Sequence, residues 1–314
     1  MRIEVEYKNH TGKLTTKTFP MTRLAFAKHL AIAGQAYAPC LQKFIRFVGM
    51  YWSYSYYIQK SAFNEDRFSE PPIQLSDPTE KSHFSNLAGK AIADFLSKRI
   101  DQSIFTVNYE AAMRLRNIPI KGCRPDLLAY KSNENIFAIE AKGYSGGCRD
   151  MQKHKNQSQQ GAIPVNFSVA CVSYNLYKKV RCNYYDPFND NIPFDEELFR
   201  ELTKNYYRGL SEFLKFPYRE HPIQDEVFYE VELFPHFLKK ILSDNMNMHF
   251  RYYRYFCRDV YYRCPRLILP GRIREYAETG LPKETRPFSF EGGERDHELY
   301  IDNDRVGLII NRTT

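Results

Sequence analysis

The sequence lacks the patterns that assign a protein most directly to a membrane, metal-binding or repeat class. No apolar run approaches the ~20 residues needed to span a bilayer, and we find no internal repeat or low-complexity segment in the 314 residues. The seven cysteines are scattered without a C-x-x-C pair, so their spacing predicts neither a zinc site nor a disulfide framework. We therefore expect a cytoplasmic protein that has no membrane partner and keeps its thiols reduced.

Charged residues are plentiful, and the basic ones are in excess. The chain has 45 Lys and Arg against 37 Asp and Glu, which gives a net charge of +8 and a pI near 9.0. Such a balance favours association with polyanions such as nucleic acids, although it bears on binding and not on fold. Hydrophobic residues make up 43% of the chain and aromatic residues 15%, which is enough for a large buried core.

The order of the periodic segments predicts an α/β protein with a mixed central sheet flanked by helices. Residues 77–100 favour a helix, because Asp77 can cap it and Pro78 suits its first turn. Strand-like runs, a polar helix and two further strands follow. We place this core within residues 71–190.

The flanks of this core look different from it. Residues 1–70 begin with a hairpin pattern and continue into a helical one, which predicts an α+β region. Residues 191–314 contain long amphipathic stretches and short strand-like runs, so we expect a mostly helical region there. Either flank could recognise nucleic acid or a partner protein.

The strongest chemical signal lies in two apolar runs that each carry charge at one end. Asp126 opens the first run, and Glu140-Ala141-Lys142 closes the second. Unpaired charge is costly to bury, so these charges need a role. Because side chains alternate along a strand, Glu140 and Lys142 share a face, and antiparallel pairing can bring Asp126 close to them. Two neighbouring carboxylates suit Mg²⁺, and an adjacent ammonium can orient water for hydrolysis of a phosphodiester.

Pro125-Asp126, 13 intervening residues and Glu140-Ala141-Lys142 resemble the signature of the PD-(D/E)xK nuclease superfamily, which has the restriction-endonuclease-like fold. The resemblance implies that Asp126 and Glu140 bind Mg²⁺, for which Mn²⁺ would substitute. It further implies that the Ala141 carbonyl is a metal ligand and that Lys142 positions or activates the water. The alternative is a surface hairpin with a solvated Glu–Lys pair. It is disfavoured because Glu-Ala-Lys, usually a helical triplet, here ends a β-branched and aromatic run.

The resemblance also suggests residues on two helices. The family often has an acidic residue on the helix before the first core strand, for which Glu80 is the nearest match and Asp94 the second. Glu80 could instead be a first-turn carboxylate favoured by the helix dipole. The family commonly has a Lys or Gln on the helix after the motif, and the candidates for substrate contact there are Gln157, Lys153 and Lys155.

A second basic feature lies in the C-terminal flank. Arg251, Arg254 and Arg258 recur at helical spacing among tyrosines, so they could hold phosphates while the tyrosines stack on bases. A solvated basic helix face explains the same pattern equally well.

Together these features predict a Mg²⁺-dependent endonuclease that cuts DNA, of the kind found in restriction, phage defence or mobile elements. A homodimer or a defence-complex partner would be compatible with the unassigned flanks. Two alternatives remain open from the sequence. One is a nucleic-acid-binding or assembly subunit that keeps a nuclease-like fold without cutting, and the other is an RNA-cleaving enzyme.

Overall fold

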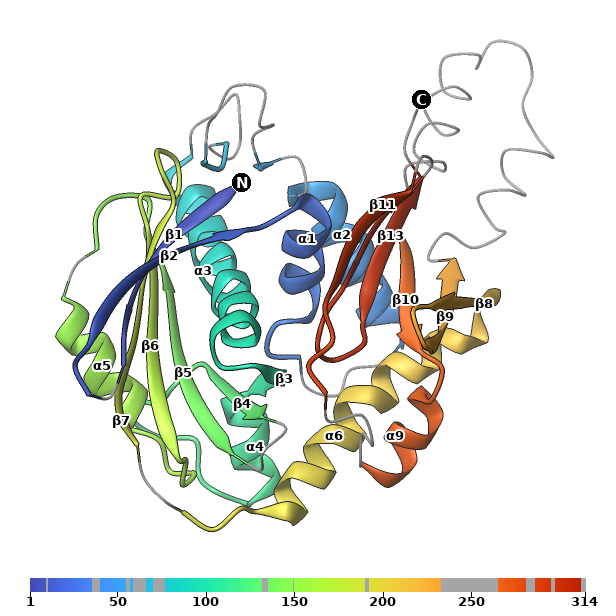
Figure 1. Ribbon diagram of the computed structural model, residues 1–314. Coiled ribbons are helices and arrows are strands. Elements are labelled where there is room, and N and C mark those ends of the chain that lie inside the picture. The colour runs from blue at the N-terminus through green and yellow to red at the C-terminus, as the bar shows by residue number, and fades with distance from the viewer. Residues whose placement is uncertain are drawn as a thin grey trace.

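The structure is a computed structural model that describes most of the chain. The described residues are 1–9, 11–35, 40–54, 57–58, 66–69, 77–131, 135–148, 150–189, 192–232, 265–280, 286–294 and 297–311. They form an α/β protein with two sheets and helices packed between and around them (Figure 1).

A mixed sheet of seven strands forms the centre of the described structure, in the order β2-β1-β7-β6-β5-β4-β3. The strands are β1 (Arg2–Lys8), β2 (Leu14–Pro20), β3 (Ser103–Asn108), β4 (Leu127–Lys131), β5 (Ile136–Gly143), β6 (Phe167–Tyr174) and β7 (Arg181–Asn189). Two pairs, β1 with β7 and β5 with β6, are parallel, and the other neighbours are antiparallel. The predicted N-terminal hairpin is therefore present and extends this sheet beyond β7.

Helices cover both faces of the central sheet (Figure 1). On one face lies α3 (Pro78–Ile100), which begins as predicted, with the Asp77 side chain accepting a hydrogen bond from Thr79 N. On the other lies α5 (Met151–Gln159), the predicted polar helix. Three further helices are α1 (Arg23–Ile32), α2 (Cys40–Tyr54) and α4 (Tyr109–Leu115). No helix among the described residues is both long and apolar enough to cross a membrane.

Close packing fixes α3 against the end of β5. A Cβ atom on Gly143 would overlap the Ser85 carbonyl oxygen, and one on Gly89 would overlap the backbone of Lys142 and Gly143. Only glycine permits so close an approach of helix and strand backbones. The backbone that carries Lys142 is thereby held against a helix.

The C-terminal region forms a second, antiparallel sheet in the order β11-β12-β13-β10-β9-β8. Its strands are β8 (Tyr218–Ile223), β9 (Glu226–Glu232), β10 (Arg266–Pro270), β11 (Phe290–Glu294), β12 (His297–Ile301) and β13 (Gly307–Asn311). Beside it lie α6 (Glu196–Ser211), the 3-10 helix η3 (Glu212–Lys215) and α9 (Ile273–Thr279). The prediction of a mostly helical region is thus wrong for the described residues. These strands are short, and β10 pairs with β9 and β13 across long stretches of sequence, whereas the other pairs join strands that follow one another in the chain.

Buried charges join the second sheet to the helices that lie between the sheets in Figure 1. Asp304, in the turn between β12 and β13, forms ion pairs with Lys28 of α1 at 2.8 Å and Lys98 of α3 at 2.7 Å. His29 Nδ1 of α1 lies 2.6 Å from Asp94 Oδ2 of α3. All five side chains are buried, so each cation is satisfied only by partners from another element.

Candidate active site

Antiparallel pairing of β4 and β5 brings Asp126 and Glu140 together. Leu127 is paired with Ile139, and Asp126 N donates a hydrogen bond to the Ile139 carbonyl at 3.0 Å. One step further along an antiparallel pair, Asp126 lies opposite Glu140, with both side chains on the same face. Tyr109 N donates to the Asp126 carbonyl at 3.1 Å, so α4 also holds the start of β4 in place.

Lys142 lies between the two carboxylates. Its Nζ is 3.2 Å from Asp126 Oδ2 and 2.7 Å from Glu140 Oε1, so these two oxygens are no more than about 6 Å apart, within reach of one divalent ion. Asp126 Oδ2 also accepts a hydrogen bond from Ala141 N at 3.0 Å. The structure thus brings together the three residues that the sequence nominated, and it ties the Ala141 backbone to the same point.

Glu140 is the unusual member of this group. Its side chain is fully buried, its Oε1 lies 2.7 Å from the Lys142 ammonium, and its Oε2 has no hydrogen-bond partner. Burial raises the pKa of Glu140 to about 8, Asp126 adds to the rise, and Lys142 opposes it. A buried carboxyl group with a strongly raised pKa and a charged neighbour is typical of functional sites.

The pKa of Lys142 is also raised, but for a different reason. Burial lowers the pKa of its ammonium, but Asp126 and Glu140 outweigh this effect, and the net shift is upward. The side chain is 28% exposed, so this cation is both held in its charged form and reachable from solvent.

Helix α5 adds a histidine that the sequence analysis missed. His154 Nδ1 lies 4.0 Å from Glu140 Oε1 and has no hydrogen-bond partner, while its Nε2 is 2.8 Å from the Tyr144 hydroxyl. Burial, and then the Lys142 ammonium, lower the pKa of His154. Helical spacing could have nominated it, because it lies three residues before Gln157 on the same helix.

The three candidates on α5 are placed differently from one another. Gln157 reaches the site region: its Nε2 donates to the Arg124 carbonyl at 3.2 Å, and it lines a pocket of about 240 Å³ with Asp126. Lys153 is exposed and Lys155 is half-buried. Neither lysine forms an ion pair with the two carboxylates within the described residues.

The two candidates on α3 do not join the pair. Glu80 is exposed in the first turn, nine residues before Gly89, which is about 14 Å along a helix from the point of contact with Lys142. Asp94 is buried, with hydrogen bonds to His29 and to Thr106 Oγ1 at 2.7 Å. Its carboxylate is already satisfied on the side of the helix that faces α1.

The three arginines of the C-terminal flank, Arg251, Arg254 and Arg258, lie outside the described residues. Their role in substrate binding stays a prediction.

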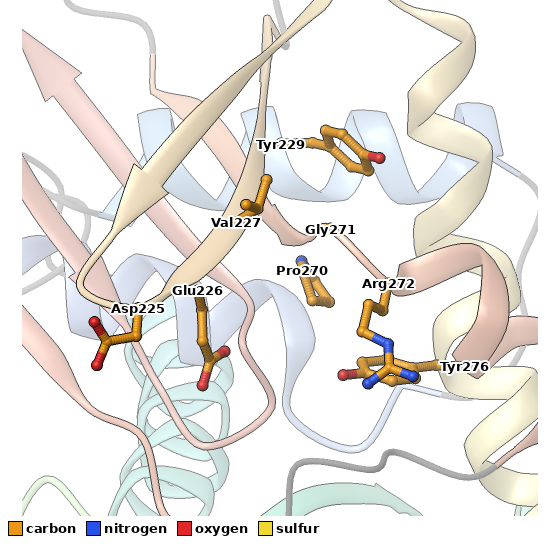
Figure 2. Close-up of a pocket in the computed structure, with 8 residues that line it drawn as sticks. All are labelled: Asp225, Glu226, Val227, Tyr229, Pro270, Gly271, Arg272 and Tyr276. Atoms are coloured by element: carbon orange, nitrogen blue, oxygen red, sulfur yellow. The ribbon is translucent and has the colours of Figure 1, made fainter.

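A second pocket lies away from this site, near the turn between β8 and β9. It has a volume of about 380 Å³, with Asp225 and Glu226 on one side and Arg272 and Tyr276 on the other (Figure 2). Its charges have partners nearby: Arg272 Nε lies 2.8 Å from Glu275, and Glu226 Oε1 lies 3.1 Å from Arg305 Nη2. It therefore lacks the unpaired buried groups found around Glu140.

The group around Glu140 passes a chemical test for a cation site, with one adjustment. Glu140 lies beside Asp126, and both Glu140 Oε2 and the nearby His154 Nδ1 have no hydrogen-bond partner. Carboxylates and imidazole are donors suited to a divalent ion. No three His, Cys, Asp or Glu side chains in the described residues already stand as a metal-binding group. The Lys142 ammonium lies between the carboxylates, so it would move aside when the ion binds.

No protein-family model matches the chain, and no curated protein or solved structure matches it at a significant level. The interpretation of the site therefore rests on the residues of this chain.

Proposed function

We propose that the protein is a metal-dependent nuclease that hydrolyses phosphodiester bonds, with Asp126, Glu140 and Lys142 at its active site. One observation carries the proposal: Glu140 is fully buried opposite a second carboxylate, the Lys142 ammonium contacts both groups, and Glu140 Oε2 has no hydrogen-bond partner. One lysine offsets only one of two neighbouring negative charges, and buried charge without a full set of partners is costly. A divalent cation is the partner that would satisfy both carboxylates together.

Residues at the start of β4 and in β5 supply the ligand set. Asp126 and Glu140 would hold Mg²⁺ or Mn²⁺, with the Ala141 carbonyl as a further oxygen ligand. Such an ion, when bound, polarises the scissile phosphate and lowers the pKa of a coordinated water. Few protein ligands at the site leave room for water and phosphate oxygens, as Mg²⁺ requires.

Lys142 provides the positive charge for the reaction. In the metal-free site its ammonium is held by Asp126 and Glu140. Displaced toward solvent, it can hydrogen-bond the attacking water and offset negative charge that develops on the phosphate. The pKa of Lys142 is raised, so it would act as a cation that orients the water and not as a proton acceptor.

Two broader features support DNA as the substrate. The net charge of +8 favours a polyanionic partner. The mixed sheet, with α3 before the motif strands and α5 after them on the other face, is the arrangement expected of a restriction-endonuclease-like core. We therefore propose an endonuclease acting on DNA, in restriction, phage defence or a mobile element.

The test is a cleavage assay with purified protein on plasmid, linear duplex, single-stranded DNA and RNA, each with Mg²⁺, Mn²⁺ or EDTA. We expect metal-dependent cutting of DNA, which Asp126→Asn and Glu140→Gln abolish together with metal binding. Lys142→Met should lower the cutting rate by at least about 100-fold. Its metal affinity should be equal to that of wild type or higher, because a neighbouring positive charge is removed. The exposed Lys178, in the turn between β6 and β7, provides the control variant Lys178→Met.

The outcomes separate the candidate functions. Cutting in EDTA, or full activity in Lys142→Met, would refute the proposed mechanism. Cutting of RNA alone would support the RNA-cleaving alternative. Metal-independent DNA binding without any cutting would support a binding subunit, in which Lys142 permanently neutralises the two carboxylates.

A further inference from the structure

We infer that His154 Nδ1 is a third side-chain ligand of the cation at Asp126 and Glu140, and that the site selects Mn²⁺ over Mg²⁺. This inference rests on the proposed metal site. It goes beyond it by adding a nitrogen donor from α5 and by changing which ion is preferred.

The geometry carries the argument. His154 Nδ1 and Glu140 Oε1 lie 4.0 Å apart, too far for a hydrogen bond. Two ligand atoms bound to one ion at about 2.1 Å each, at a wide angle, are separated by about this distance. Glu140 Oε1 is already contacted by the Lys142 ammonium at 2.7 Å, whereas His154 Nδ1 has no hydrogen-bond partner, so the unsatisfied polar atom at this gap is the imidazole nitrogen.

The second ring nitrogen orients the first. His154 Nε2 lies 2.8 Å from the Tyr144 hydroxyl. When Nε2 donates to that hydroxyl, Nδ1 carries a lone pair 4.0 Å from a carboxylate oxygen, and a cation between the two atoms would bind both. A hydrogen bond from the other nitrogen of a ligating histidine is the usual way in which proteins fix the ring for metal binding.

The ring is also held in place by its surroundings. The His154 side chain is only 6% exposed, on a helix whose N-terminus is capped by Asp150 through Lys153 N at 3.0 Å. Tyr144 directly follows Gly143 at the end of β5. The imidazole and the carboxylate therefore sit on elements that pack against each other, so the main rearrangement on binding an ion is the displacement of the Lys142 ammonium, which lies 2.7 Å from Glu140 Oε1.

A nitrogen donor changes the preference of the site. Mg²⁺ binds oxygen ligands and its own waters, whereas imidazole is a good ligand for first-row transition metals. A set of two carboxylates and one imidazole fits Mn²⁺, which accepts both kinds of donor. A water molecule bridging Nδ1 and Glu140 would explain the gap without any metal, and the experiment must distinguish the two.

The test measures metal binding directly and does not depend on cutting. Metal-free full-length protein is titrated with Mn²⁺ and with Mg²⁺ by calorimetry, and its Mn²⁺ complex is measured by pulsed electron paramagnetic resonance. We expect Mn²⁺ to bind at least about 10-fold more tightly than Mg²⁺, with a directly coordinated ¹⁴N visible in the spectrum. His154→Leu should abolish the nitrogen signal and weaken Mn²⁺ binding by about 10- to 100-fold, while changing Mg²⁺ binding much less. His154→Asn, which can offer an amide oxygen near the Nδ1 position, should recover part of the affinity without the imidazole signal.

His83 is exposed on α3 and supplies the control variant His83→Leu, and circular dichroism checks that each variant is folded. The inference is overturned if wild-type protein fails to bind Mn²⁺, if its Mn²⁺ spectrum shows no coordinated nitrogen, or if His154→Leu keeps the wild-type selectivity. The proposed nuclease fails separately: His154-dependent Mn²⁺ binding without cleavage of any nucleic acid would refute the reaction and leave the metal site standing. If wild type and His154→Leu cut equally well with Mn²⁺ and with Mg²⁺, the role of His154 as a ligand would be refuted and the proposed nuclease would stand.

Discussion

Replacing Glu140 by Gln is expected to stabilise the metal-free protein while it abolishes metal binding. The wild-type side chain is fully buried, its Oε2 has no hydrogen-bond partner, and burial followed by the Asp126 charge raises its pKa from 4.5 to about 8. The folded protein must therefore either bury an ionised carboxylate or take up a proton. Gln has nearly the same shape and requires neither.

The structure sets the size of the effect. One unit of pKa shift corresponds to about 1.4 kcal/mol, so the shift gives a ceiling of about 5 kcal/mol at high pH. Near pH 7 the folded protein takes up the proton instead, which limits the cost to about 3 kcal/mol. Burial of the Gln amide without good partners offsets part of this gain, so we expect a net gain of about 1–2 kcal/mol near neutral pH.

The pH dependence follows from the sign of the shift. A carboxyl group whose pKa is higher in the folded state makes the protein less stable as pH rises, here between about 4.5 and about 8. The advantage of Glu140→Gln should therefore be absent near pH 4, grow through this window and stay constant above it. Chemical denaturation in EDTA at several pH values measures this, with Glu220→Gln at an exposed position as the control. Saturating metal should reverse the order, because only the wild type gains binding energy. A variant that is less stable than wild type in EDTA at neutral pH would refute the reasoning.

Two further predictions concern other buried carboxylates. Burial, and then a neighbouring carboxylate, raise the pKa of Asp186 to about 7, so this group should make the wild-type protein less stable as pH rises from about 4 to about 7. Asp186→Asn should therefore gain about 1–3 kcal/mol of unfolding free energy above pH 7 and nothing near pH 4. A variant whose unfolding free energy depends on pH as in wild type would contradict this. Asp304→Asn should cost about 3–5 kcal/mol, because it removes the closer carboxylate and leaves the two buried ammonium groups of Lys28 and Lys98 to share the more distant Asp302, at 3.7 and 3.9 Å. The exposed Asp225 provides the control for the Asp304 variant, and an equal loss in both would show that the buried ion pairs contribute nothing specific.

Much of the central sheet could be predicted because its signals are local. Asp77 and Pro78 mark the start of α3, and the apolar runs on both sides of residues 132–134 predict a paired β4 and β5. The second sheet was predicted only in part, because strand-like runs near the C-terminus match β12 and β13 while the region as a whole was expected to be mostly helical. Its β11 strand contains Gly292 and Gly293, which weaken any strand signal, and β10 pairs with strands that lie far away in sequence on both sides.

In the candidate site, too, the residues set by local strand pairing could be predicted and those set by helix packing could not. Alternation along one strand and pairing with the next suffice to bring Asp126, Glu140 and Lys142 to one point, so the sequence nominated all three. Which side of α3 or α5 faces that point depends on how each helix packs on the sheet. Periodicity gives the faces of a helix but not their direction in the fold, and for this reason Glu80 was nominated and His154 was missed.

The contrast between two buried clusters in this molecule favours function over structure at Glu140. Asp304 is as buried as Glu140, yet its oxygens are contacted by Lys28, Lys98 and the Tyr206 hydroxyl. The fold can therefore satisfy a buried carboxylate fully when the role of that carboxylate is to join elements. Glu140 Oε1, by contrast, meets the ammonium of Lys142 at 2.7 Å, a lysine that it shares with Asp126, and its Oε2 has no hydrogen-bond partner. Local departures from good packing chemistry concentrate at functional sites, where a ligand supplies what the protein leaves out. The arrangement around Glu140 therefore supports the proposed cation site.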